Sequence, residues 1–298
     1  MEEVAPASVF EQQDLDDVLE AEPLEDAAFV EYEELGTPHY DKLQGLLQNA
    51  KLPKTDGSRI KKTMEHYRQW VDTMDSLQGD GDDLVEKLVG ALNEYKLHVD
   101  LELVFDSPND FLYRQNGQLK ISSSILEEFL PRLVDPRIIP SLAGQTYSKG
   151  SKKSFASAYF ATGLRNPARG AGLRIRTKDQ DFTVGRLVYL RSSLDETFPP
   201  TKTVTQKAFL AFIAAECKTN LDKTMWQEAT ATSHDLRIGL PGSNYFLLCE
   251  WLDMPVPSRE GTDIRRVYIF RGKRLASDVR AKYATAAGRQ SARDEYEA

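Results

Sequence analysis

The chain has 298 residues, of which 41% are hydrophobic, so it is long enough to bury a substantial core. Its apolar runs are all shorter than the roughly 20 residues that span a membrane, and its first ten residues lack the features of a secretory signal. Two cysteines and four scattered histidines exclude a zinc site, and we expect a cytoplasmic protein with both thiols reduced and buried.

The net charge of -8 is unevenly distributed along the chain. Residues 1–41 hold 14 of the 46 Asp and Glu residues and no Lys or Arg, which leaves 32 acids against 38 bases in residues 42–298. We therefore predict an acidic, disordered tail over residues 1–38, attached to a mildly basic body that binds a polyanion. The tail is either a solubilising segment or one that occupies the polyanion groove or a partner subunit, and the sequence leaves its role open.

Residues 39–135 are predicted to form a mainly helical region. Apolar residues recur there at spacings of three and four, which places each set on one face of a helix. The first set is Met64, Tyr67, Trp70, Val71 and Met74, and the second is Leu84, Leu88, Leu92 and Tyr95. Both stripes are typical of helices that pack into a core.

Two further elements are expected before residue 136. Asn116-Gly117 stands between two short apolar arms in residues 111–121, a pattern that favours a β-hairpin. Ser124 and Glu127 have the spacing of a capping box, so a helix is predicted from there to about Val134.

The composition changes at residue 136. Residues 136–178 contain no Asp or Glu, but they contain nine Lys or Arg residues with aromatic residues among them. Such a stretch suits the neutralisation of phosphates in a nucleic-acid groove, with an ordinary solvated basic face as the alternative. The nine residues are Arg137, Lys149, Lys152, Lys153, Arg165, Arg169, Arg174, Arg176 and Lys178. Several glycines favour a partly loop-like structure here.

Residues 136–298 are expected to form an α/β domain. The apolar run Tyr245–Trp251 is typical of a strand that is buried on both faces. Strands alternate with helices along this part of the chain, which predicts a mixed sheet flanked by helices. The predicted strands cover residues 182–190, 209–215, 245–251 and 267–270, and the predicted helices cover residues 221–236 and 276–296.

Glu216 and Lys218 form the strongest candidate for a catalytic centre. Alternate side chains of a strand share a face, so these two project together, while Cys217 points to the opposite face and into the core. The carboxylate suits Mg²⁺, which prefers hard oxygen ligands, and the ammonium group can orient a water and offset negative charge in a transition state. The triplet 94–96 has the same spacing, but its helical pattern turns the two side chains apart.

A metal site needs a further carboxylate from another segment. Asp181, at the start of the strand that precedes Glu216, is the preferred candidate, and Asp179 and Asp195 are the alternatives. Glu250 lies in a later buried run, where it is either an additional ligand or a member of an ion pair at the edge of the core.

The segment after Lys218 predicts a helix beside this site. Thr219-Asn220 supplies capping chemistry for its start, with Asp222 in the first turn. Gln227, two turns along, is either a residue that reaches a water or phosphate in the site or part of an exposed face. Lys223 is a candidate phosphate contact.

Residues 209–228, FLAFIAAECKTNLDKTMWQE, resemble the core of the PD-(D/E)XK nucleases: a strand, an E-x-K and a helix that carries a glutamine. With YFLLCEWLDM downstream, the string AECKTNLDKTMWQEATATSHDL is similar to Type II restriction endonucleases of the BbvCI type, which cut a short asymmetric DNA site with two different subunits. The resemblance covers roughly residues 140–290. It implies metal ligands at Glu216 and the upstream acid, and a catalytic lysine at Lys218. Gln180-Asp181 replaces the Pro-Asp of the pattern, which leaves the choice of upstream acid open.

The resemblance thus implies an α/β fold of the restriction-endonuclease type with a helical N-terminal region, and a Mg²⁺-dependent Type II restriction endonuclease, or one subunit of it. The enzyme would hydrolyse double-stranded DNA as a homodimer or as a heterodimer with a related subunit. The predicted catalytic residues are Asp181, Glu216, Lys218 and Gln227, with metal bound by Asp181 and Glu216. The predicted DNA contacts are Lys149, Lys152, Lys153, Arg165, Arg169, Arg174, Arg176 and Lys223.

Two other functions stay open from the sequence. One is a repair or mobile-element nuclease of the same superfamily with little sequence preference. The other is a catalytically silent DNA-binding module, in which Glu216 and Lys218 form a structural ion pair. The recognition sequence and the cut position do not follow from these residues.

Overall fold

The N-terminal part of the protein is built from helices that share a core with the sheet that follows. The computed structural model describes residues 36–271, 283 and 285–297, so the predicted acidic tail lies outside the described residues except for 36–38. The helices are α2 (Pro38–Leu47), α3 (Lys54–Ser76), α4 (Gly81–Leu97), η1 (His98–Phe105), α5 (Phe111–Leu119), α6 (Ser124–Leu133) and η2 (Pro140–Leu142).

A five-stranded mixed sheet follows, in the spatial order β1-β2-β3-β4-β5. The pairs β1–β2 and β2–β3 are antiparallel, whereas β3–β4 and β4–β5 are parallel. The strands are β1 (Ser148–Phe160), β2 (Leu173–Ser192), β3 (Val204–Leu221), β4 (Asn244–Leu252) and β5 (Ile264–Ile269), and the remaining helices are η3 (Arg169–Gly172), α7 (Lys223–Gly239) and α9 (Ala286–Glu297). The predicted mixed α/β sheet is therefore confirmed.

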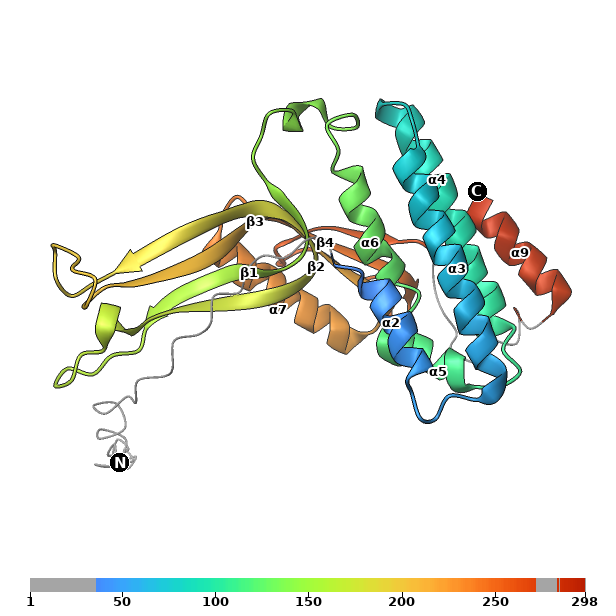
Figure 1. Ribbon diagram of the computed structural model, residues 1–298, viewed down its shortest axis with the longest axis horizontal. Helices are drawn as coiled ribbons and strands as arrows, with labels where there is room; N and C mark the ends of the chain where they lie inside the picture. Colours follow the sequence, from blue (N-terminus) through green and yellow to red (C-terminus); the bar gives the residue numbers. More distant parts are fainter. Residues whose placement is uncertain (1–35, 272–282, 284, 298) are drawn as a thin grey trace, which may run out of the picture.

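The sheet is covered on both faces. Buried apolar residues of α2–α6 form one core with Phe182, Ala215, Cys217 and neighbouring side chains of the sheet. Ala229 and Leu236 of α7 belong to a second core with apolar residues of β3, β4 and β5. Figure 1 shows β1, β2 and β3 continuing beyond these helices as long antiparallel arms. The two cores hold the central part of β3 between helices, which fixes where its charged end lies.

The periodic apolar residues of α3 and α4 face this first core as predicted. Met64, Tyr67, Trp70 and Met74 are buried, whereas Val71 lies at the edge of the core. The indole ring of Trp70 stacks on the ring of Tyr95 from α4, with 4.8 Å between ring centroids. Stacked aromatic pairs of this kind add to the apolar area that the helices bury.

The hairpin predicted around Asn116-Gly117 is wrong. Helix α5 runs through both residues, and Leu112 on its buried side joins the first core. A two-residue hairpin turn of the type expected from this dipeptide needs positive φ at both positions, and neither residue has it. The side chain of Asn116 instead accepts a hydrogen bond from the backbone N–H of Ser122, at 2.9 Å, and stabilises the turn after the helix.

The acid-free stretch is less loop-like than predicted, because β1 and the first part of β2 occupy much of it. Strand β2 begins at Leu173, nine residues before the predicted start, and β1 was not predicted. Residues 148–154, SKGSKKS, carry no alternating apolar pattern because much of β1 is solvated. The backbone pairing with β2, and not a hydrophobic face, defines this strand.

The helix starts differ from those expected. Strand β3 continues to Leu221, so Asp222, and not Thr219-Asn220, caps α7 by accepting from the N–H of Met225 at 2.8 Å. Helix α6 begins at Ser124 without a side-chain cap, and Glu127 is paired with Lys42 instead. The final helix α9 overlaps the end of the predicted helix 276–296, whose earlier part mostly lies outside the described residues. None of the helices in the described parts of the chain is long and apolar enough to cross a membrane.

Candidate active site at the end of strand β3

Glu216 and Lys218 lie on β3, in register with Leu247 and Cys249 of the parallel strand β4. Cys217 between them is fully buried in the core beneath the N-terminal helices, so the two charged side chains lie on the other face of the strand. Nζ of Lys218 forms an ion pair with Oε1 of Glu216. Lys218 is only 7% exposed, so this ammonium group is largely shielded from solvent.

Tyr245 completes the surroundings of the Glu216 carboxylate. Its hydroxyl donates a hydrogen bond of 2.5 Å to Oε2 of Glu216. Burial, together with the negative charge of Glu216, raises the pKa of Tyr245 far above its usual range. The tyrosine therefore stays protonated at neutral pH and remains a donor to the carboxylate.

Asp181 is the upstream acid that lies beside this pair. Phe182 of β2 pairs with Ala215 of β3, so Asp181 and Glu216 occupy the next position along the same two strands. Oδ2 of Asp181 accepts a hydrogen bond from the backbone N–H of Cys217, at 2.7 Å. The side chain of Asp181 is thereby held against the residue that follows Glu216.

The two alternative acids are placed differently. Asp179 is exposed and pairs in register with Lys153 of β1. Asp195 lies in the loop between β2 and β3, where its carboxylate contacts Lys202 at 2.9 Å and accepts from Thr197. Those hydrogen bonds lower the pKa of Asp195 to about 2. Of the three candidates, Asp181 is the one whose side chain contacts the backbone between Glu216 and Lys218.

Glu127 of α6 is a further acid near this site that the sequence assigned to a capping box. It is buried, and burial together with the negative charge of Asp181 raises its pKa. Its carboxylate accepts from Nζ of Lys42 at 3.4 Å. No local spacing relates Glu127 to Asp181, because the packing of α6 on the sheet brings them together, so only a three-dimensional signal reveals it.

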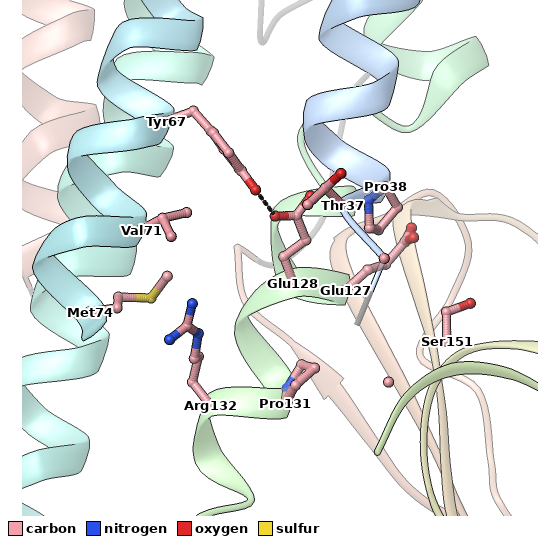
Figure 2. A pocket seen from close by; sticks show the side chains of 12 residues that line it. Thr37, Pro38, Tyr67, Val71, Met74, Glu127, Glu128, Pro131, Arg132 and Ser151 are labelled. Carbon is pink, nitrogen blue, oxygen red and sulfur yellow. Dashed lines mark hydrogen bonds between the residues drawn. The ribbon is translucent and has the colours of Figure 1, made fainter. Parts of the chain in front are cut away.

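A small cavity of about 130 Å³ opens beside Glu127, lined by residues of α3, α6 and β1 and by the start of α2. Figure 2 shows Glu127 and Glu128 on consecutive positions of α6, with the hydroxyl of Tyr67 pointing to Glu128. Glu128 also accepts from the backbone N–H groups of His39 and Tyr40, so it anchors α2. Glu127, by contrast, has a pKa that is raised by burial and by the negative charge of Asp181 on the sheet.

The carboxylate oxygens at this site are the kind of ligand that a hard divalent cation prefers. Asp181 and Glu216 offer carboxylate oxygens from adjacent strands, and Mg²⁺ is often held by one or two carboxylates with waters completing its shell. Within residues 36–271, 283 and 285–297, no three His, Cys, Asp or Glu side chains gather as closely as they do around a bound ion. The carboxylates are instead held by the ammonium, hydroxyl and N–H groups described above.

A solved structure shares this architecture. The native BbvCI A2B2 tetramer matches 90% of this chain and 95% of the matched chain, with a TM-score of 0.58 and 22% sequence identity. The model of the Bpu10I restriction endonuclease family matches residues 118–298. The chain belongs to the Bpu10I restriction endonuclease family. No curated protein sequence matches it.

The part matched by the Bpu10I family begins at the end of α5 and includes α6, the sheet and α7. It therefore contains Glu127, Asp181, Glu216 and Lys218, whereas α2, α3 and α4 precede it. The predicted resemblance to restriction endonucleases of the BbvCI type is confirmed by the family and the fold together.

Helix α7 of this Bpu10I family member begins directly after β3. Lys223 is exposed in its first turn, and Gln227 is exposed one turn later. Ala229 and Leu236 face the sheet instead. The role predicted for Gln227 in the site stays a prediction.

The predicted DNA contacts fall into two groups. Lys153, Arg165 and Lys223 are exposed, and Lys152 and Arg174 are partly exposed. The remaining three form hydrogen bonds or ion pairs within the protein, although Arg169 and Arg176 are exposed as well. They are Lys149, which donates to the carbonyl of Val134, Arg169, which donates to the carbonyls of Pro200 and Thr203, and Arg176, which pairs with Asp235 of α7.

Glu250 belongs to a buried ion cluster. Its Oε1 lies 2.6 Å from Nζ of Lys96 on α4, which also contacts Asp100 at 3.7 Å. Arg271 pairs with Asp100, and the hydroxyl of Ser122 lies among these groups. Of the two interpretations of Glu250, these contacts favour the ion pair at the core. Residues 94–96 are helical, so the second E-x-K triplet is not a strand site.

Proposed function

We propose that this chain is a Mg²⁺-dependent Type II restriction endonuclease subunit that hydrolyses phosphodiester bonds of double-stranded DNA at a short specific site. The family supports a nuclease, and the hydrogen bond from the backbone N–H of Cys217, between Glu216 and Lys218, to Asp181 supports the position of its active site. The two acids and the lysine that the sequence singled out thus lie on the adjacent strands β2 and β3.

In this proposal Asp181 and Glu216 hold the metal ion, and Glu127, whose pKa is raised by burial and by the charge of Asp181, is a further acid near the site. Bound Mg²⁺ supplies a water of lowered pKa and shields the charge of the phosphate. Tyr245 keeps the Glu216 carboxylate in one orientation by its short hydrogen bond, and the N–H of Cys217 does the same for Asp181.

In this proposal Lys218 stabilises the transition state. Its ammonium group is nearly buried and lies against Glu216, so its positive charge acts in a poorly solvated environment where electrostatic effects are strong. We assign it the orientation of the attacking water and the stabilisation of the negative charge that develops on the phosphate. Gln227 is proposed as an auxiliary residue from α7.

The exposed bases provide the electrostatic part of DNA binding. Lys153 lies on β1, Arg165 in the loop between β1 and β2, and Lys223 at the start of α7. Phosphate contacts by such residues orient the duplex without reading its sequence. Arg169 and Arg176 contribute to this surface mainly by fixing the elements that carry it.

A heteromeric assembly is part of the proposal. The structural neighbour is an A2B2 tetramer, and we propose that this chain likewise acts with a related subunit, each supplying one active site. The silent-module alternative is favoured by one observation, the direct ion pair between Lys218 and Glu216, which satisfies both charges without a metal.

Digestion of plasmid DNA separates these functions. The purified chain is incubated with Mg²⁺, alone and with a co-expressed related subunit, and Glu216→Gln is the control. Discrete fragments from the wild-type chain, absent with Glu216→Gln, support the restriction enzyme. A smear indicates a nuclease without sequence preference, and intact plasmid in both mixtures contradicts the proposed activity in favour of a silent module.

A further inference from the structure

Lys120 has an unusual backbone conformation at the end of α5. Its φ of 54° and ψ of 41° lie in the left-handed region, where glycine meets no steric penalty and a lysine does. Residues held in this region are enriched at functional sites, where the surrounding structure enforces them. The position therefore places a long cationic side chain where a smaller residue would be easier to accommodate.

The side chain of Lys120 points to the acids of the candidate active site. Its Nζ lies 3.6 Å from Oδ2 of Asp181. Lys120 is about a third exposed and Asp181 about a fifth exposed, so this contact is partly shielded from solvent. The positive charge of Lys120 thus lies directly against one of the two acids assigned to the metal ion.

The turn that carries Lys120 is firmly held. Ser122 donates its hydroxyl to Asp100 and accepts from Lys96 at 2.6 Å within the buried ion cluster. The hydroxyl of Thr219 on β3 donates to Ser123 at 3.0 Å. These contacts fix the turn against the strand that carries Glu216, so the ammonium group of Lys120 stays within reach of the acids.

We propose that Lys120 is the built-in counter-ion of this acid cluster, which a divalent cation must displace, so that Lys120 sets the metal affinity of the site. The inference rests on the proposed function, because it takes Asp181 and Glu216 as metal ligands. Until the ion binds, Lys120 offsets the repulsion among the acids. A cation that enters the cluster meets the positive charge of the lysine and has to move it away from Asp181.

The test is calorimetric titration of the full chain with Ca²⁺, which needs no catalytic turnover. Lys120→Met removes the charge and keeps most of the side-chain volume, whereas Lys120→Arg keeps the charge. We expect Lys120→Met to bind Ca²⁺ about tenfold more tightly than the wild type, and Lys120→Arg to bind it with wild-type affinity. Lys120→Gly relieves the backbone conformation and gives the same comparison if the methionine variant does not fold.

Lys42→Met is the matched control, because Lys42 lies 3.4 Å from Glu127 but contacts the cluster from α2. A change as large as that of Lys120→Met would mean a general effect of charge and would overturn the inference. Equal Ca²⁺ affinity of Lys120→Met and the wild type would overturn the inference as well, but it would not contradict the proposed metal site. Absence of Ca²⁺ binding in every variant would overturn the inference together with the proposed metal site.

Discussion

Replacing Glu250 by Gln tests whether the buried ion cluster stabilises the fold or serves the active site. Glu250 is 1% exposed and Lys96 is 5% exposed, with 2.6 Å between carboxylate and ammonium. Removing one charge of a buried pair leaves the other uncompensated, which typically costs about 3–5 kcal/mol. Lys96 keeps Asp100 and the hydroxyl of Ser122 as partners, so we expect the lower end, about 3 kcal/mol.

Chemical denaturation of Glu250→Gln measures this loss in the free energy of unfolding. The control is Asp83→Asn, which removes a pair with Lys87 at the same distance of 2.6 Å but on the exposed face of α4. Solvent-exposed pairs contribute less than about 1 kcal/mol. Equal losses of stability in the two variants would contradict a structural role of Glu250. So would a Glu250→Gln variant that keeps its stability and instead loses Ca²⁺ binding, as a metal ligand would.

Three further predictions concern other contacts. Tyr245→Phe removes the hydrogen bond to Glu216, so Mg²⁺-dependent cleavage should slow by about tenfold with unchanged DNA affinity in Ca²⁺, and an unchanged rate would contradict the role of the tyrosine. Burial lowers the pKa of His39 to about 3. Below pH 6.5 this histidine is therefore protonated in the unfolded chain but stays neutral in the folded chain. Unfolding free energy should therefore fall by about 1.4 kcal/mol per pH unit between pH 6 and 4, and His39→Gln should reduce that slope in denaturation curves. Arg165→Ala should lower the slope of log affinity for DNA against log salt concentration by about one ion. Arg169→Ala, which breaks hydrogen bonds to carbonyl groups, should leave this slope unchanged. Equal slopes for the two variants would argue against assigning only Arg165 to a phosphate.

The strand with its acid and lysine could be predicted because local patterns determine it. The apolar run before Glu216 and the alternation of side chains around Cys217 are both visible in the chain, and both correspond to the observed strand. The helices α3 and α4 follow from apolar spacing in the same way. In each case the burial of one face decides the structure, and burial leaves a periodic signal.

The parts that were missed depend on contacts between distant segments. Strand β1 is mostly polar, so its sequence does not predict a strand. Its backbone pairing with β2 determines its structure instead. Glu127 and Lys120 reach Asp181 only through the packing of α6 and of the turn after α5, so spacing along the chain gives no hint of them. Asn116-Gly117 led to the opposite error, the prediction of a hairpin turn from a local pattern. The segment is helical instead, and the helix buries Leu112 in the core.

The proposed chemistry depends most directly on the ammonium group of Lys218, and the variant Lys218→Ala tests it. Single-turnover cleavage of a DNA substrate in Mg²⁺, with the related subunit present, is compared with the dissociation constant for the same DNA in Ca²⁺. We expect the rate to fall by about a hundredfold or more while DNA affinity changes by less than about twofold, because the charge acts in the transition state. Cleavage at the wild-type rate, or a loss of affinity as large as the loss of rate, would contradict the proposed active site.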